Sequence, residues 1–226
     1  MEELLEFFRQ CYFTMLFMFL AQCLTVAVGV RHRKKFNELK HFHYYPIAGL
    51  IQTILCFFSV VYDDIKIIPQ SISMFIVIEF CALYLFALRT IVLKVERTLI
   101  KILFTAFMIY AVTMWIYADA LLNYYELYLM QSIFLIIASV VYFFQLFRLV
   151  SYENLATQPS FWINIGVLFF FSSTIPLYLL ESSSRFFINH NWYLYSINYT
   201  AYGVFYLLIC KAYLCKTVTR LNYSLS

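Results

Sequence analysis

Glu79 is the residue with the clearest chemical potential, because it is an acid inside the long apolar segment Ser71–Leu93. It lies about 12 Å along that segment from Ser71, at 1.5 Å per helical residue. An ionised carboxylate at the centre of a membrane helix costs about 2.5–3.5 kcal/mol. We therefore expect Glu79 to face the interior of a helix bundle, where it either carries a proton or accepts hydrogen bonds.

Polar residues at similar depth in other apolar segments are the expected partners of Glu79. No Lys or Arg lies at matching depth, so hydrogen bonds are expected in place of a salt bridge. The predicted ligand-binding set is Glu79, Gln52, Gln131, Ser172, Asn198 and Tyr202. Two interpretations remain open. The polar residues either join helices at about 0.6 kcal/mol each, or line a polar cavity open to the outside with Glu79 as its anchor.

The sequence contains no recognisable catalytic or metal-binding motif. It has no HExxH, GxSxG, CxxC or phosphate-binding loop, and its four histidines lie in loops or at segment edges. The only lysine of the last apolar segment, Lys211, lies near its end, which disfavours a retinal pigment. We expect no enzyme activity, no catalytic residues, no metal and no cofactor.

The composition points to an integral membrane protein. Of 226 residues, 64% are hydrophobic and 12% are charged, whereas soluble domains have about a quarter charged. This balance disfavours a soluble enzyme, a disordered chain and a nucleic-acid-binding module. The principal partner of the chain is therefore the lipid bilayer.

Seven apolar runs can each form a membrane-spanning helix, since about 20 residues cross the hydrocarbon layer. The predicted spans are Cys11–Val30, His43–Tyr62, Ser71–Leu93, Leu99–Ala118, Glu126–Phe147, Phe161–Leu180 and Trp192–Cys215. The connections are too short for a soluble domain. We predict an all-α, polytopic membrane helix bundle with one domain over residues 1–226.

The charge distribution predicts the orientation. Most of the 16 Lys and Arg residues follow the odd-numbered spans, as Lys94, Arg148 and the Arg31–Lys40 cluster do, while Glu2 and Glu126 lie on the other side. Cytoplasmic loops collect basic residues, so we expect the N-terminus outside and the C-terminus in the cytoplasm. The Arg31–Lys40 cluster is interpreted as a topology signal, with an anionic-lipid contact as the alternative.

Tyrosines fall into two classes by position. Those at span ends, including Tyr44 and Tyr45, are expected in an interfacial aromatic belt. Tyr202 lies within a span, so its hydroxyl needs a partner.

The segment before the sixth span has features of a helix start. Pro159 disfavours helix at the residue before it, and Ser160 is the expected N-cap. Asn164 is expected to bond a neighbouring helix, and Gly166 to permit close helix approach.

Several stretches resemble a group of small, uncharacterised seven-helix membrane proteins of Bacteroidota. The resemblance rests on Glu79–Phe80, on the run Pro159–Gly166 and on Ser172–Ser173. Where such proteins carry an acid near Gln131, this chain has an amide. The resemblance implies a bacterial inner membrane but no particular activity.

Three functions fit these observations. The first is a sensor or receptor-type module that binds a small or lipophilic ligand near Glu79 from outside and signals to a cytoplasmic partner. The second is a small-solute or ion transporter or channel subunit, although the first three and last three spans show no self-similarity. The third is a structural or accessory subunit. We rank the sensor first, because a buried intramembrane acid usually marks a functional site.

Overall fold

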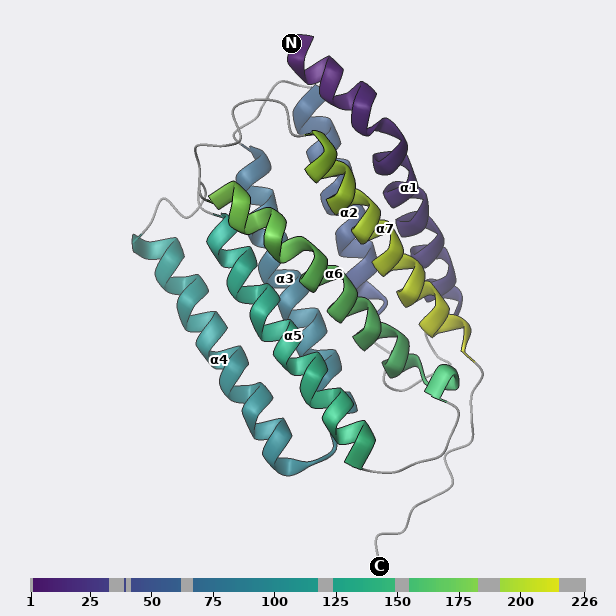
Figure 1. Cartoon of the computed structure of the whole chain (residues 1–226), viewed down its shortest axis with the longest axis vertical. Coiled ribbons are helices and arrows are strands. Elements are labelled where there is room, and N and C mark those ends of the chain that lie inside the picture. Colours follow the sequence, from purple (N-terminus) through teal and green to yellow (C-terminus); the bar gives the residue numbers. More distant parts are fainter. Residues whose placement is uncertain are drawn as a thin grey trace, which may run out of the picture.

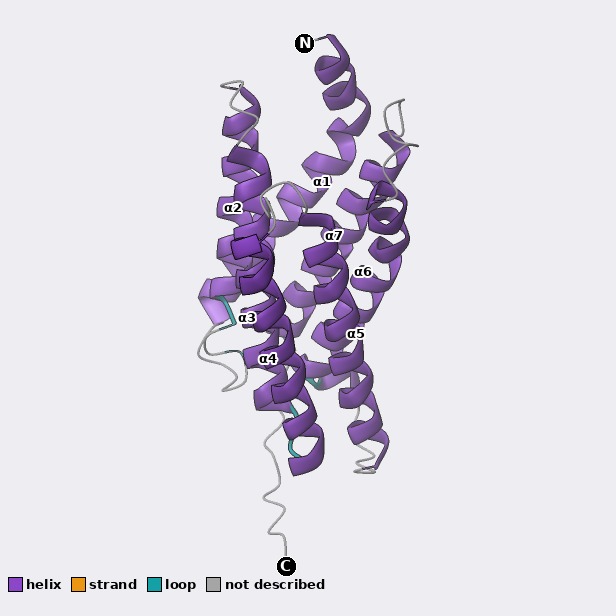
Figure 2. Cartoon of the chain, turned by 90° about the vertical axis from the view of Figure 1, so that its left-hand side faces the viewer, coloured by secondary structure: helices purple, strands orange, loops and turns teal. Residues whose placement is uncertain are grey.

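The computed structural model describes residues 2–32, 39, 42–61, 67–117, 124–148, 155–182 and 192–215. These residues form an all-helical bundle (Figures 1 and 2). Its helices are α1 (Glu2–His32), α2 (Tyr44–Val61), α3 (Ile67–Thr90), α4 (Lys94–Tyr117), α5 (Tyr124–Arg148), α6 (Pro159–Ser182) and α7 (Trp192–Leu214), with the short 3-10 helix η1 (Leu155–Thr157) before α6.

Each predicted span corresponds to one helix. The largest differences are at the starts of α1, which begins at Glu2 and not at Cys11, and of α4, which begins at Lys94 and not at Leu99. Hydropathy marks where the apolar run begins, but Lys94, Glu96 and Arg97 are compatible with helical geometry and form a polar first turn.

Five of the helices in the described residues are long and apolar enough to cross a membrane. They are Cys11–His32, Ser71–Thr90, Lys94–Ile116, Tyr124–Arg148 and Pro159–Leu179. The apolar part of α2, Tyr44–Phe58, is shorter. The sequence of α7 is rich in tyrosine, and Tyr206 and Tyr213 of that helix are buried against its neighbours.

Six helices form a closed ring, and α4 lies outside it. Around the ring, α1 contacts α2 and α7, α3 contacts α2 and α5, and α6 contacts α5 and α7. The contacts of α4 are with α3 and α5 (Figure 1). Consequently α3 and α5 lie side by side and run in the same direction, with α4 carrying the chain back between them.

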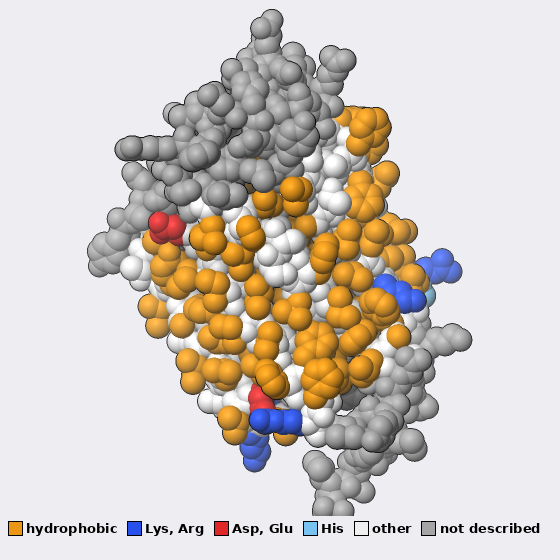
Figure 3. Space-filling model, viewed as in Figure 1, with side chains coloured by type: hydrophobic (Ala, Val, Ile, Leu, Met, Phe, Trp, Pro, Cys, Tyr) orange, Lys and Arg blue, Asp and Glu red, His pale blue; other side chains and the backbone are white. Residues whose placement is uncertain are grey.

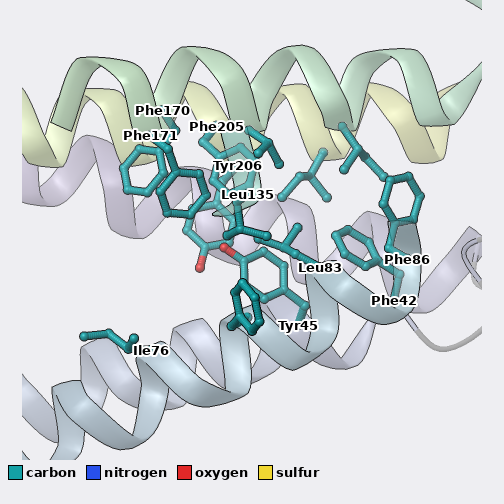
Figure 4. Close-up of a cluster of buried hydrophobic side chains, with 14 of the residues drawn as sticks. Phe42, Tyr45, Ile76, Leu83, Phe86, Leu135, Phe170, Phe171, Phe205 and Tyr206 are labelled. Carbon is teal, nitrogen blue, oxygen red and sulfur yellow. The ribbon is translucent and has the colours of Figure 1, made fainter. Parts of the chain in front are cut away.

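Aromatic side chains fill the inside of the ring (Figure 4). The rings of Tyr45 and Tyr206 stack with their centroids 6.1 Å apart, and those of Phe170 and Phe205 stack at 5.3 Å. Gly166 allows α6 and α7 to meet closely, as predicted, because a Cβ there would lie 2.8 Å from the Phe205 ring. The interior is therefore packed with rings contributed by α2, α6 and α7.

The outer surface is largely apolar along the middle of the bundle, with few charged side chains (Figure 3). The described basic side chains all lie where α1, α3, α5 and α7 end and α4 begins; they are Arg31, Arg89, Lys94, Arg97, Lys101, Arg148 and Lys211. We call this the basic end. Glu126 lies at the opposite end. Residues 33–38 and 40 of the predicted basic cluster, and the side chain of Glu2, lie outside the described residues.

The start of α6 differs from two predictions. The helix begins at Pro159, so Ser160 is not the N-cap; its hydroxyl instead pairs with that of Tyr142 at 3.0 Å. Asn164 donates to the backbone oxygen of Ser160, 2.8 Å away on its own helix, and not to a neighbouring one. Proline suits the first helical position because its missing N–H has no partner to lose there.

Candidate functional site

Glu79 occupies the middle of α3 and points into the ring. Its side chain is 0% exposed. Ile76, Phe80 and Leu83 on the same helix are also buried, whereas Met74, Ile78 and Leu85 are exposed. The face of α3 that carries the acid is therefore turned away from the apolar outer surface, as the cost of a lipid-facing carboxylate predicts.

Three side chains from three helices donate hydrogen bonds to the Glu79 carboxylate. The Tyr45 hydroxyl of α2 lies 2.6 Å from Oε1, and Nε2 of Gln131 on α5 lies 2.7 Å from Oε2. The Tyr202 hydroxyl of α7 is more distant, at 3.5 Å from Oε1. We call these four residues the Glu79 cluster. Through it, one carboxylate connects α3 to both of its ring neighbours and to α7 on the opposite side of the ring.

No described Lys or Arg side chain neutralises this carboxylate. The one ion pair among the described residues joins Arg148 and Glu96 at 3.0 Å, at the basic end. The expectation that Glu79 has hydrogen-bond partners and no salt bridge is thus confirmed for the described part of the chain. Neutral donors stabilise a negative charge but leave the net charge of the site unchanged.

The structure brings together half of the predicted ligand-binding set. Glu79, Gln131 and Tyr202 lie in the Glu79 cluster. Gln52 instead donates to Ser71 Oγ at 3.2 Å and to Cys56 Sγ at 3.1 Å, which links α2 to α3.

Two other predicted residues lie outside the cluster. Ser172 is exposed on α6, and its hydroxyl donates to the backbone oxygen of Leu168. Asn198 is half-buried on α7, and its Oδ1 is buried without a hydrogen-bond partner among the described residues.

Tyr45 is the member of the cluster that the sequence analysis missed. Its assignment to the interfacial belt is wrong, because Tyr45 is 1% exposed whereas its neighbour Tyr44 is 61% exposed. Position along a span indicates depth but not which face of the helix a residue occupies. The spacing of these residues could have identified it, because Tyr45, Gly49 and Gln52 recur at intervals that place residues on one face of a helix.

Other polar side chains link neighbours around the ring. Thr53 donates to Gln22 Oε1 at 2.9 Å, which joins α2 to α1. The hydroxyls of Tyr128 and Thr174 lie 3.0 Å apart and join α5 to α6. For these residues, hydrogen bonding between helices accounts for the polar atoms without any ligand.

Glu79 is enclosed by the bundle, and an open groove of the described structure lies elsewhere. A shallow groove on the outside of the bundle, between α6 and α7, is lined by Phe169, Ser173, Ser196, Ile197, Thr200 and Ala201. Glu79 does not reach this groove. A ligand that approaches Glu79 from outside must therefore move Tyr202 or another member of the enclosing aromatic core.

Within the described residues, no three His, Cys, Asp or Glu side chains come together as a metal site would require. Comparisons with protein-family models, with curated proteins and with solved structures find no match for the chain.

Proposed function

We propose that this protein is a sensor or receptor-type membrane module with its ligand site at Glu79. The observation that carries the proposal is that one fully buried carboxylate accepts hydrogen bonds from α2, α5 and α7. Any ligand that binds this carboxylate changes one or more of those bonds. Because the bonds join α3 to three other helices, ligand binding would change a contact between helices, which is how a small event in a packed core becomes a helix movement.

The proposed topology has seven spans, with the N-terminus outside and the C-terminus in the cytoplasm. It is supported by the seven consecutive helices of the bundle and by the position of the described basic side chains at one end, since positive residues favour the cytoplasmic side. The basic end would then face the cytoplasm and contact a signalling or accessory protein. The resemblance to Bacteroidota membrane proteins supports a bacterial inner membrane as the location.

The proposal is tested by measuring whether the Glu79 cluster sets helix positions. Spin labels are placed at positions 89 on α3 and 211 on α7, both exposed at the basic end, in a chain whose native cysteines are replaced by alanine. We expect Glu79→Gln and Glu79→Ala each to shift the distance distribution in lipid nanodiscs. Ser172→Ala is the matched control, because it removes an intramembrane hydroxyl outside the cluster. Identical distributions in all four proteins would contradict a receptor role for Glu79.

A transporter is the second candidate, favoured by the symmetry of the ring. When α1, α2 and α3 are matched in order with α5, α6 and α7, the contacts within the first set of three helices correspond to the contacts within the second. The contact of α3 with α5 likewise corresponds to the contact of α7 with α1. Parallel three-helix repeats joined by an extra helix occur in transporters. In proteoliposomes with an entrapped pH-sensitive dye, a proton-coupled transporter would carry protons, and Glu79→Gln would abolish that flux. A receptor would leave the liposomes as tight as protein-free ones.

A further inference from the structure

The Glu79 cluster contains no positive charge, and one of its polar atoms has no hydrogen-bond partner among the described residues. Gln131 is 0% exposed, and its Nε2 donates to Glu79. Its Oε1 is buried and has no hydrogen-bond partner among the described residues. A buried acceptor without a donor costs about 1–3 kcal/mol. The same amide already bonds the carboxylate through Nε2, so a half-turn of the amide would bring the acceptor to a protonated Oε2.

A carboxamide can serve either protonation state of a carboxyl group. Its NH₂ donates to a carboxylate, and after a half-turn its oxygen accepts from a carboxylic acid. The two orientations occupy nearly the same volume, and which one is present is set by the surrounding hydrogen bonds. An ionised acid at position 131 could not donate to an ionised Glu79, and an apolar side chain could serve neither state.

We propose that Glu79 is a reversible proton-binding site and that the Gln131 side-chain amide turns over when the proton binds. The inference rests on the proposed function, because it names the proton as the ligand of the same site. It requires no cavity, which fits the closed packing around Glu79.

Protonation of Glu79 exchanges one hydrogen bond for another. A proton from the aqueous phase forms an O–H bond at Oε2 of Glu79, and the negative charge disappears. The bond from Gln131 Nε2 to Oε2 is lost, and a bond from Oε2–H to Gln131 Oε1 replaces it. The bonds from Tyr45 and Tyr202 to Oε1 remain, because that oxygen accepts in both states. Proton binding thus reverses the hydrogen bond between α3 and α5 and keeps the number of bonds.

Among the described residues, the other ionisable groups that face Glu79 are tyrosines. They are Tyr45 from α2, Tyr128 from α5, and Tyr202 and Tyr206 from α7. From α4, the side facing α3 presents Phe104 and Phe107, whose rings pack on Phe80. Tyrosine hydroxyls stay protonated at neutral pH, so Glu79 is the group that exchanges a proton.

Infrared difference spectroscopy of the full chain in nanodiscs tests the proposal. Lowering the pH should produce a carboxylic-acid carbonyl band that is absent in Glu79→Gln. In Gln131→Met, which removes the amide at similar size, this band should move to the frequency of an acid that donates no hydrogen bond. Either the absence of a Glu79 band across the pH range of the folded protein, or an unchanged band position in Gln131→Met, would overturn the proposal.

A measurement on the native sequence covers the case in which Gln131→Met does not fold. With side-chain carbonyl-labelled glutamine, one amide carbonyl band should shift with the same pH midpoint as the Glu79 band, and a fixed set of amide bands would refute the turnover. The distance between spin labels at positions 89 and 211 distinguishes a failure of this inference from a failure of the proposed function. If Glu79 titrates while that distance stays constant with pH, the proton site stands and the sensor role fails.

Discussion

Hydrogen bonds to Glu79 differ in length, and their lengths suggest different roles. The Tyr45 and Gln131 bonds are short, whereas the Tyr202 bond lies at the limit of hydrogen-bond distance. A charged acceptor strengthens a bond to about 1.5–3 kcal/mol, and misalignment or stretching weakens it. We infer that Tyr45 and Gln131 hold the carboxylate in place and that Tyr202 is the partner most easily displaced.

Replacing Tyr45 by Phe should destabilise the protein. The variant keeps the ring that stacks on Tyr206 but leaves Glu79 Oε1 with only the long bond from Tyr202. We expect a loss of about 1–3 kcal/mol in the free energy of unfolding, measured by thermal or denaturant unfolding in mild detergent. Tyr44→Phe is the matched control, because Tyr44 is the adjacent residue and is largely exposed. Equal stability of the two variants would show that the Tyr45 hydroxyl contributes nothing.

At the scale of helices, two features hold the bundle together away from Glu79. Gly166 lets α6 and α7 approach closely, as described above. Gln145 of α5 fastens the turn between α3 and α4: its Oε1 accepts from the backbone N–H of Val92 at 2.8 Å, and its Nε2 donates to the backbone oxygen of Thr90 at 3.3 Å. One side chain therefore caps backbone groups at the end of α3 that the helix itself cannot satisfy.

Gly166→Ala should weaken the packing of α6 on α7. The added methyl group would meet the Phe205 ring, which is fully buried and has no space to move into. We expect a loss of about 1–3 kcal/mol, typical of overpacking. Gly203→Ala is the comparison. Its methyl group would come closer to a ring than the one at position 166, but that ring, Phe17, is 37% exposed and so has open space on its outer side. The smaller loss should therefore be in Gly203→Ala, and the reverse order in unfolding experiments would contradict this account.

Gln145→Leu should loosen the turn between α3 and α4 while leaving the ring intact. Without the amide, the N–H of Val92 and the oxygen of Thr90 lose their side-chain partner. Hydrogen exchange followed by mass spectrometry should show faster exchange in residues 90–97 and unchanged exchange around Glu79. Gln145→Glu retains an acceptor for Val92 and should give an intermediate rate. Unaltered exchange at the turn in Gln145→Leu would rule out the fastening role.

For the whole molecule, the charges at the two ends predict the orientation in the membrane. Single cysteines are introduced at Glu126, at the end opposite the basic end, and at Arg148, at the basic end; both side chains are exposed. In a chain without native cysteines, a membrane-impermeant maleimide should label position 126 in intact cells. Position 148 should react only after the membrane is permeabilised. The opposite pattern would reverse the proposed topology.

The sequence predicts well how deep a residue lies along its helix, but it predicts poorly how each helix is rotated about its own axis. Long apolar runs locate all seven helices, and the cost of a carboxylate in lipid predicts that Glu79 faces inward. Gln52, Ser172 and Tyr45 show the limit: each lies at a recognisable depth, but which helix face points inward depends on the order of helices around the ring. That order follows from packing between segments far apart in the chain, such as α1 against α7 and α3 against α5, which hydropathy does not contain.

The hydrogen-bond partners of Glu79 are synthesised at different times. A ribosome makes the chain from its N-terminus, so Tyr45, which precedes the acid by 34 residues, is present when α3 enters the membrane. Gln131 follows 52 residues later, and Tyr202 follows 123 residues later. During biogenesis, the Tyr45 hydroxyl is therefore the one member of the Glu79 cluster that can donate a hydrogen bond to the acid until α5 is made. A chain that lacks this hydroxyl would expose the acid to lipid or to the insertion machinery until α5 arrives.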